Sequence, residues 1–295
     1  MSTPMAPVSQ PEASTRDSSL EALEGQLQSA LQQRYRRDRM FSVVAPLAAA
    51  VLLVIVWELA VRIFDIPDYL IPAPSSVIVE LVSKISLIAA NGALSTEEIV
   101  LGFLLSVIIG IPLGIAIFLS PIFARSIYPM LVSSQAVPKS AIAPLFVIWF
   151  GFGILPKILI AFFIAFFPIV INTVVGLASI ETEKIFLARS MGMSSVTTFL
   201  KIRLPQALPS IFGGLKIAIA LAVVGAIVGE FVGADAGLGY LLLVANGNLD
   251  TTLLFAGLVG LTVIGVGLFL IVELIERLAL PWHSSQRNAG ARESM

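Results

Sequence analysis

The chain has 295 residues, of which 57% are hydrophobic and 13% are charged, and its formal net charge is -1 at pH 7. A soluble domain carries about 25% charged residues, so this deficit predicts a polytopic membrane protein whose surface faces lipid. The chain has no cysteine, which excludes disulfides, thiolate metal sites and cysteine nucleophiles. Its one histidine, His283, supplies too few imidazoles for a histidine-based metal site or proton relay.

Residues 1–40 are polar and lack the early apolar run of a signal peptide. Leucines at helical spacing favour an amphipathic helix over residues 17–35, and a solvated tail is the alternative. An arginine cluster directly precedes the first apolar run, at Arg34, Arg36, Arg37 and Arg39. A basic cluster beside a span is typical of a topology signal that keeps this end in the cytoplasm. We therefore expect no nucleic-acid partner.

Six helical spans are predicted, which makes the fold class all-α and polytopic. They run over about residues 41–64, 98–119, 125–150, 157–179, 210–232 and 252–278. Prolines forbid regular helix directly after the first span, and a short helix is expected at 77–89. Gly110 and Gly114 give the second span a close-packing face. The third span is interrupted near Pro138-Lys139.

A long polar segment, Ile180–Pro209, interrupts the apolar body between the fourth and fifth spans. Acidic residues at its start suit a helix N-terminus, and Gly192 permits a sharp turn. A second helical pattern follows over 196–202, and Leu204-Pro205 is expected to stop it. The segment is predicted to form two short helices joined by a turn, with an ordinary connecting loop as the alternative.

The placement of basic residues predicts the orientation of the chain. With the N-terminus inside, the inner segments carry the arginine cluster and most other cations, including four in the loop 180–209. The outer segments carry only Arg62, Lys84 and Lys157, and residues 233–250 have neither lysine nor arginine. This bias predicts that both termini and the loop 180–209 are cytoplasmic.

The fifth span carries glycines at four-residue intervals, at Gly225, Gly229, Gly233 and Gly237. Glycines so spaced lie on one helix face and let another helix approach closely. The first three, with the neighbouring Glu230, are candidates for helix packing or for lining a transport pathway. Because an acidic group at membrane depth is costly, Glu230 is expected to form structural hydrogen bonds, and a pathway role is the alternative. Lys216 is expected to reach the interface.

Motifs of enzymes and nucleotide sites are missing. The nearest string to a phosphate-binding loop is 151–157, where Pro156 stands in place of a required glycine. Gly237-Leu238-Gly239 lacks the third glycine of a dinucleotide fingerprint and is interpreted as an outer turn. The sequence has no metalloprotease or esterase motif, and no intramembrane aspartate pair. We expect no catalytic residue, no metal and no directly bound cofactor.

The spacing from Gly192 over nine residues to Ile202-x-Leu204-Pro205 resembles the EAA loop of ABC-importer permeases. The triplet itself departs from the family pattern, because Phe186-Leu187-Ala188 keeps only the last alanine. Other motifs are similar to those of the permeases for nitrate, sulfonates, taurine and related solutes. These are Ile71-Pro72-x-Pro74, Val137-Pro138-Lys139, Ala143-Pro144-Leu145, Trp149-Phe150-Gly151, Phe167-Pro168-Ile169, Asn172-Thr173, Gly237-Leu238-Gly239 and Leu280-Pro281-Trp282.

The resemblance implies a type I, MetI-like permease in a bacterial inner membrane. It implies a second permease copy in a homodimer, a cytoplasmic ATPase dimer that uses ATP, and an extracytoplasmic solute-binding protein. It also implies that the loop transmits ATPase closure through Ala188, Arg189, Ser190, Gly192, Ile202, Leu204 and Pro205. The solute would be a sulfonate, taurine, nitrate or a related organic nutrient.

On this reading the chain divides into a cytoplasmic tail at 1–40 and a first span with an outer segment at 41–95. A permease core at 96–280, with its coupling loop at 180–209, and a cytoplasmic tail at 281–295 complete it. The alternative function is a secondary transporter or channel that works without an ATPase. Such a protein is expected to show mid-membrane carboxylates for coupling ions and a repeat between chain halves, and the sequence shows neither.

Overall fold

The computed structural model describes residues 44–46 and 48–281 and is helical wherever it has regular structure. The predicted N-terminal helix, the arginine cluster and His283 lie outside the described residues. Five described helices are long and apolar enough to cross a membrane, or six if one bent pair counts as a span. An all-helical polytopic fold is thereby confirmed.

The chain forms two compact units, one ending at Ala60 and the other comprising residues 61–289. The described part of the first unit belongs to the apolar helix Val44–Ile63. Its side chains are largely exposed, as expected of a span that faces lipid.

The first helix that lies wholly in the second unit is α2 (Pro74–Ser83), which has proline in its first turn, where no backbone N–H is needed. The long helix α3 (Ile85–Leu119) follows after a single residue. The predicted bounds were partly wrong. The short helix expected at 77–89 is α2, which starts and ends earlier. The second span, expected at 98–119, extends back to Ile85 because no proline or glycine pair breaks its first turns. The bent pair α4 (Pro121–Ser134) and α5 (Lys139–Phe150) comes next, with an angle of 97° between its helices. This bend confirms the interruption predicted near Pro138.

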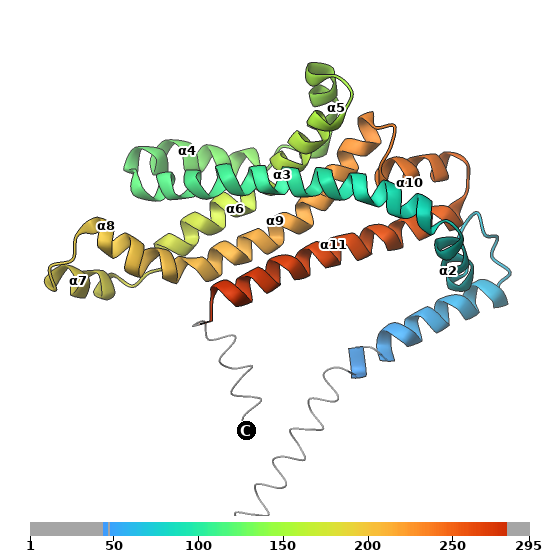
Figure 1. Ribbon diagram of the computed structural model, residues 1–295, viewed down its shortest axis with the longest axis horizontal. Helices are drawn as coiled ribbons and strands as arrows, with labels where there is room; N and C mark the ends of the chain where they lie inside the picture. The colour runs from blue at the N-terminus through green and yellow to red at the C-terminus, as the bar shows by residue number, and fades with distance from the viewer. Residues whose placement is uncertain (1–43, 47, 282–295) are drawn as a thin grey trace, which may run out of the picture. The chain divides into compact units, whose positions relative to one another are not determined.

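The centre of the unit is α6 (Ile154–Ala178), which packs against both α3 and α9 (Leu204–Gly233) (Figure 1). A methyl group added at Gly114 of α3 would lie 2.7 Å from Cβ of Thr173 in α6. This close approach confirms the packing face that the Gly110–Gly114 spacing predicted. The shared core of these helices contains small and β-branched side chains, which let the three helices lie close together.

Two further helices close the unit. The segment after α9, predicted as a loop, contains α10 (Leu238–Gly247), which starts at Gly237 with a φ of 115°. Leu238, Leu241 and Ala245 of α10 are buried against α11 (Thr251–Ala279) and its neighbours. The turn expected at Gly237-Leu238-Gly239 is present at Gly237, but the segment 233–250 is not a plain loop, because most of it is helical. Ten residues are too few for a span, but their apolar face is covered by tertiary contacts.

Candidate functional site

The polar segment 180–209 begins with a short helix and a turn at Gly192, as the sequence predicted. The helix α7 (Thr182–Ser190) ends at a turn in which Gly192 has a φ of 79°, and open space surrounds its Cα. The N–H of Gly192 donates to Arg189 O at 3.0 Å, and the N–H of Met193 donates to Ala188 O at 3.1 Å. These bonds satisfy carbonyls at the end of α7, so the turn is held by the backbone itself.

The second short helix does not stop at Leu204-Pro205, and this prediction was wrong. The helix α8 (Ser195–Thr198) passes into a π-helical turn, η1 (Phe199–Arg203), and then directly into α9. The N–H of Leu204 donates to Phe199 O, five residues back. Pro205 has no N–H to donate and sits in the first turn of α9, where a proline is tolerated. A single apolar helix therefore runs over Ser195–Gly233.

The predicted coupling residues fall on different parts of this loop. Ala188 is a buried residue of α7, whereas Arg189 and Ser190 are exposed. The last three, Ile202, Leu204 and Pro205, are half-buried around the π-helical turn. Large apolar side chains that the sequence analysis gave no role are exposed beside them. These are Phe186, Leu187, Met191, Val196 and Leu200, each at least half exposed. The sequence did contain a signal for this surface, because these apolar residues stand among charged ones in a loop, and exposed apolar patches mark contact surfaces.

The glycines of the fifth span face neighbouring helices of the same chain. A methyl group at Gly225 would lie 2.6 Å from Cα of Ala161, and one at Gly229 would lie 3.0 Å from Cα of Lys157. A methyl group at Gly233 would lie 2.9 Å from a methyl of Val147 in α5. The glycine face thus receives α6 and α5.

Glu230 is buried and fastens the start of α10. Its carboxylate accepts a hydrogen bond from Ser95 Oγ at 2.5 Å and another from the N–H of Gly239. Ser95 Oγ in turn accepts from the N–H of Leu238 at 2.8 Å, and Asn91 Oδ1 accepts from the N–H of Gly237 at 2.9 Å. These bonds satisfy three backbone donors at a helix N-terminus, which also favours a negative charge there.

A second buried carboxylate, which the sequence analysis did not single out, lies next to this cluster. Glu98 of α3 forms an ion pair with Lys157 of α6, and both side chains are almost fully buried. Glu98 also interacts with Glu230, so the two buried carboxyl groups are neighbours. Lys157 was counted from the sequence as an outer-segment cation. Only the packing of α3 on α6 shows that it is buried.

A further cluster of charges lies at the junction of α2 and α3. Lys84 pairs with Glu80 at 2.6 Å and with Asp250 at 3.6 Å. Hydrogen bonding to Glu80 is the main cause that raises the pKa of Lys84 above its ordinary value. Lys84 is therefore cationic throughout the physiological pH range. Among the described residues, no group of histidine, aspartate and glutamate is arranged to hold a metal ion.

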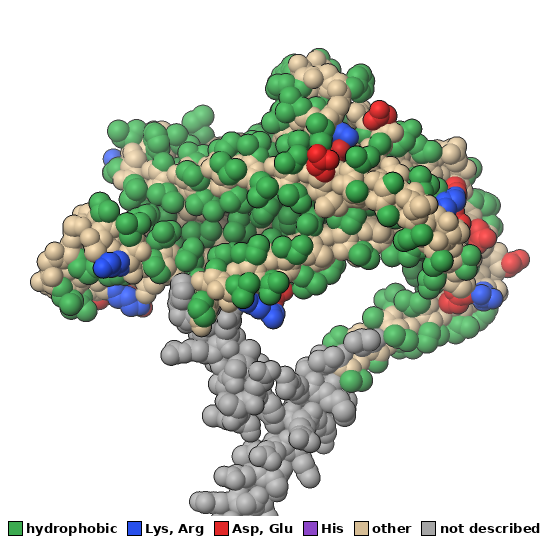
Figure 2. Space-filling view, in the orientation of Figure 1, with side chains coloured by type: hydrophobic (Ala, Val, Ile, Leu, Met, Phe, Trp, Pro, Cys, Tyr) green, Lys and Arg blue, Asp and Glu red, His purple; other side chains and the backbone are tan. Residues whose placement is uncertain are grey.

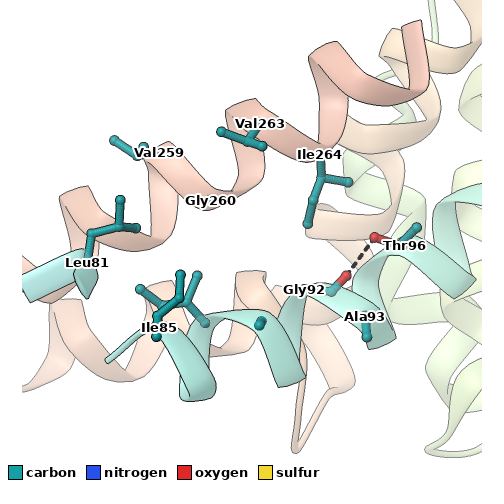
Figure 3. A pocket seen from close by; sticks show the side chains of 11 residues that line it. Leu81, Ile85, Gly92, Ala93, Thr96, Val259, Gly260, Val263 and Ile264 are labelled. Atoms are coloured by element: carbon teal, nitrogen blue, oxygen red, sulfur yellow. Dashed lines mark hydrogen bonds between the residues drawn. The ribbon is translucent and has the colours of Figure 1, made fainter. Parts of the chain in front are cut away.

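An apolar cavity of about 330 Å³ lies between α3 and α11. Figure 3 shows Ile85 and Ala93 on one side and Val259, Val263 and Ile264 on the other. Its polar side chain, Thr96, donates to Gly92 O at 2.6 Å. The lining therefore offers no unused polar side chain to a solute, and its chemistry suits hydrocarbon.

Comparison with known proteins decides the family. A family model described as "Binding-protein-dependent transport system inner membrane component" matches residues 102–281. The chain belongs to this family of inner-membrane permeases. It is 34% identical over 249 residues to the formylaminopyrimidine transport permease ThiX of Halalkalibacterium halodurans, which covers 84% of this chain and 99% of that protein. It is 32% identical over 241 residues to the taurine transport permease TauC of Escherichia coli, covering 79% of this chain and 87% of that protein.

The fold is shared with a chain of one solved ABC importer. A chain from inward-facing structures of the MetNI methionine ABC transporter superposes with a TM-score of 0.57. The match covers 66% of this chain and 97% of that one at 20% identity. The structural match shows a MetI-like, type I fold. The family match shows that the chain is an ABC importer permease and a multi-pass inner-membrane protein, in a family of transport subunits rather than enzymes.

Proposed function

We propose that this permease, paired with a second copy, forms the pathway through which a small solute enters the cell, and that its loop 180–209 couples the pathway to a cytoplasmic ATPase. The observation that carries the proposal is the continuous helix Ser195–Gly233. One end of this helix belongs to the loop, and the other end packs on α6. A force on the loop would therefore move the helix as a lever.

The exposed apolar residues of α7 and the turn supply the docking surface. Phe186 is 66% exposed and Leu187 is 64% exposed, although both stand in a segment rich in charge. Figure 1 shows α7 and α8 together beyond the end of α6, where another protein can reach them. In this proposal the ATPase receives α7 in a groove, binds and hydrolyses the ATP, and resets the pathway. The permease itself binds no cofactor.

The second copy is proposed to cover the end of α5. Ile148, Trp149 and Phe152 are 74%, 65% and 83% exposed, and α5 contacts only α6 and α9 extensively. Lipid could cover these side chains too. However, α5 is bent by 97° from α4 and presents them away from its own unit, where a second copy could reach them. A homodimer that closes over α5 would shield this face and place the helix break beside the pathway.

Charge placement supports the orientation. Figure 2 shows Lys and Arg side chains gathered at the end formed by α7 and α8, and acidic side chains around the opposite end near α2. We assign the basic end and both termini to the cytoplasm, because cytoplasmic loops carry the excess of basic residues. The acidic end would then receive an extracytoplasmic solute-binding protein.

The solute is proposed to be a sulfonate, taurine, nitrate or a related organic nutrient. Relatives of the permease are named for taurine, aliphatic sulfonates, nitrate and formylaminopyrimidine. These compounds share small size and polarity rather than one charge. Selection among them is assigned to the solute-binding protein.

The turn at Gly192 provides the test of coupling. A Gly192→Val variant is strained because a β-branched residue resists a positive φ, whereas Gly192→Asn adopts it readily. No atom crowds this site, so the two variants differ mainly in backbone conformation. We expect the valine variant to lose co-purifying ATPase and the uptake of taurine, an alkanesulfonate or nitrate into ATP-loaded vesicles. We expect the asparagine variant to retain both.

Two results would contradict the proposal. Equal ATPase retention by the valine and asparagine variants would show that the turn geometry does not govern docking. Uptake by vesicles that contain the permease but no ATPase would favour the secondary transporter or channel instead.

A further inference from the structure

A polar cavity of about 230 Å³ lies where the loop 180–209 meets the end of α3. Pockets for drug-sized ligands measure roughly 300–1,000 Å³, so this one suits a smaller group, of about the size of a phosphate. Its lining combines apolar and basic side chains: Phe118, Leu119, Ile185, Arg189, Ser195, Thr198, Phe199 and Arg203.

Within residues 44–46 and 48–281, the two arginines of this cavity have no acidic partner. No carboxylate lines the cavity, and neither Arg189 nor Arg203 forms an ion pair with any residue that the structure describes. Lys184 of the same loop, by contrast, pairs with Glu181 at 3.0 Å. The guanidinium carbon of Arg203 lies 4.9 Å from the ring centre of Phe118, which holds this cation at the end of α3. Guanidinium groups are well matched to phosphate oxygens.

Thr198 supplies an independent observation. Its side chain lines the same cavity and is only 4% exposed, yet its hydroxyl has no hydrogen-bond partner among the described residues. Buried polar atoms nearly always have a partner. A buried hydroxyl in the lining of a cavity that also holds two arginines indicates an external acceptor, because the hydroxyl can donate to an oxyanion that the arginines also bind.

The depth of the cavity identifies the source of such an oxyanion. The 35 residues of α3 extend about 52 Å at 1.5 Å per residue, whereas the hydrocarbon core of a bilayer is about 30 Å thick. Phe118 and Leu119 are the last two residues of this helix. The apolar run predicted over 98–119 also ends there, directly before Ser120 and Pro121. We therefore place Phe118 and Leu119 at the level of the lipid head groups, with the apolar part of the lining facing the start of the acyl chains.

We infer that this cavity binds the phosphate group of an anionic phospholipid. The phosphate oxygens bind Arg189 and Arg203 and accept the hydroxyl hydrogen of Thr198, while the glycerol end rests on the apolar lining. The site requires only that the chain is a membrane permease, although Arg189 belongs to α7, the helix proposed to dock in the ATPase. A lipid bound here would brace the loop against the end of α3.

Native mass spectrometry tests this inference on the full-length permease in nanodiscs of phosphatidylcholine and phosphatidylglycerol. We expect Arg203→Gln to reduce the retained phosphatidylglycerol about tenfold, which corresponds to the loss of one charge-assisted hydrogen bond. Thr198→Val removes only the hydroxyl and is expected to reduce retention severalfold. Lys201→Gln is the matched control: this exposed cation belongs to the same π-helical turn but does not line the cavity, so retention should not change.

A second arm separates lipid from soluble phosphate. Sodium phosphate is titrated calorimetrically into the permease in nanodiscs of phosphatidylcholine alone, and we expect no heat of binding. If inorganic phosphate binds and the binding requires Arg203, the cavity is still an oxyanion site, but its ligand is soluble phosphate rather than a lipid. An equal loss of phosphatidylglycerol in Lys201→Gln, or no retention by the parent protein, would overturn the inference.

Co-expression with the ATPase supplies the remaining control. Phosphatidylglycerol that leaves only when the ATPase binds would support the lipid site and show that the lipid and the ATPase compete for it. If lipid retention fails while the ATPase still co-purifies, only the lipid site is lost and the proposed coupling stands.

Discussion

The approach of α6 to α9 at Gly225 gives a prediction whose magnitude follows from the structure. A methyl group at this position would lie 2.6 Å from Cα of Ala161 and 3.2 Å from the carbonyl oxygen of Ile160. Favourable contacts between carbon atoms require about 3.5–4.0 Å. Both obstacles are backbone or Cα atoms, so no flexible side chain can move aside, and the helices must separate by about 1 Å.

The control for this change lies twelve residues earlier in the same helix. Gly213 has no atom within 4 Å of an added methyl group, and alanine is favoured over glycine in a helix by about 1 kcal/mol. Gly213→Ala should therefore be neutral or slightly stabilising. Gly225→Ala gains the same propensity but suffers overpacking of about 1–3 kcal/mol. The two variants should differ in unfolding free energy by the overpacking cost.

The measurement is the apparent Tm of the detergent-purified permease. A difference of 1 kcal/mol shifts Tm by roughly 2–4 °C for domains of 150–250 residues, so we expect Gly225→Ala to melt several degrees below Gly213→Ala. Gly225→Val should lower Tm further because it adds two more methyl groups to the same contact. Equal Tm values for Gly225→Ala and Gly213→Ala would refute the packing account and would leave Gly225 free for a pathway role.

The buried polar groups and the π-helical turn give three more predictions. Lys157→Met should destabilise the permease by about 3–5 kcal/mol because it leaves Glu98 buried and unpaired, and the double variant with Glu98→Leu should recover thermal stability. Glu230→Gln should weaken the hydrogen bond from the N–H of Gly239, since it replaces a charge-assisted bond with a neutral one. Hydrogen exchange at the start of α10 should then accelerate, and unchanged exchange would contradict this role of Glu230. Pro205→Ala restores a backbone donor, so we expect the π-helical turn to shift toward α-helix, with loss of uptake at normal membrane insertion.

Local patterns in the sequence were sufficient for the spans, the bend near Pro138 and the turn at Gly192. Runs of apolar residues have one stable solution in lipid, the helix, because it satisfies its own backbone donors. Proline and glycine affect the conformation of their own backbone, so these effects can be predicted from the sequence without knowing the tertiary contacts. The motif from Gly192 to Pro205 identified the family, which the comparisons then confirmed, and its spacing is likewise local.

Tertiary structure decided what depended on distant partners. The helix continues through Pro205 because a π-helical turn removes the need for its missing N–H, and α10 is helical because neighbouring helices cover its apolar face. Lys157 is buried because α3 brings Glu98 to it across 59 positions of sequence. The basic cavity likewise needs Phe118 beside Arg203. The sequence gives the sign of each charged side chain, but whether that side chain has an ion-pair partner depends on how the helices pack.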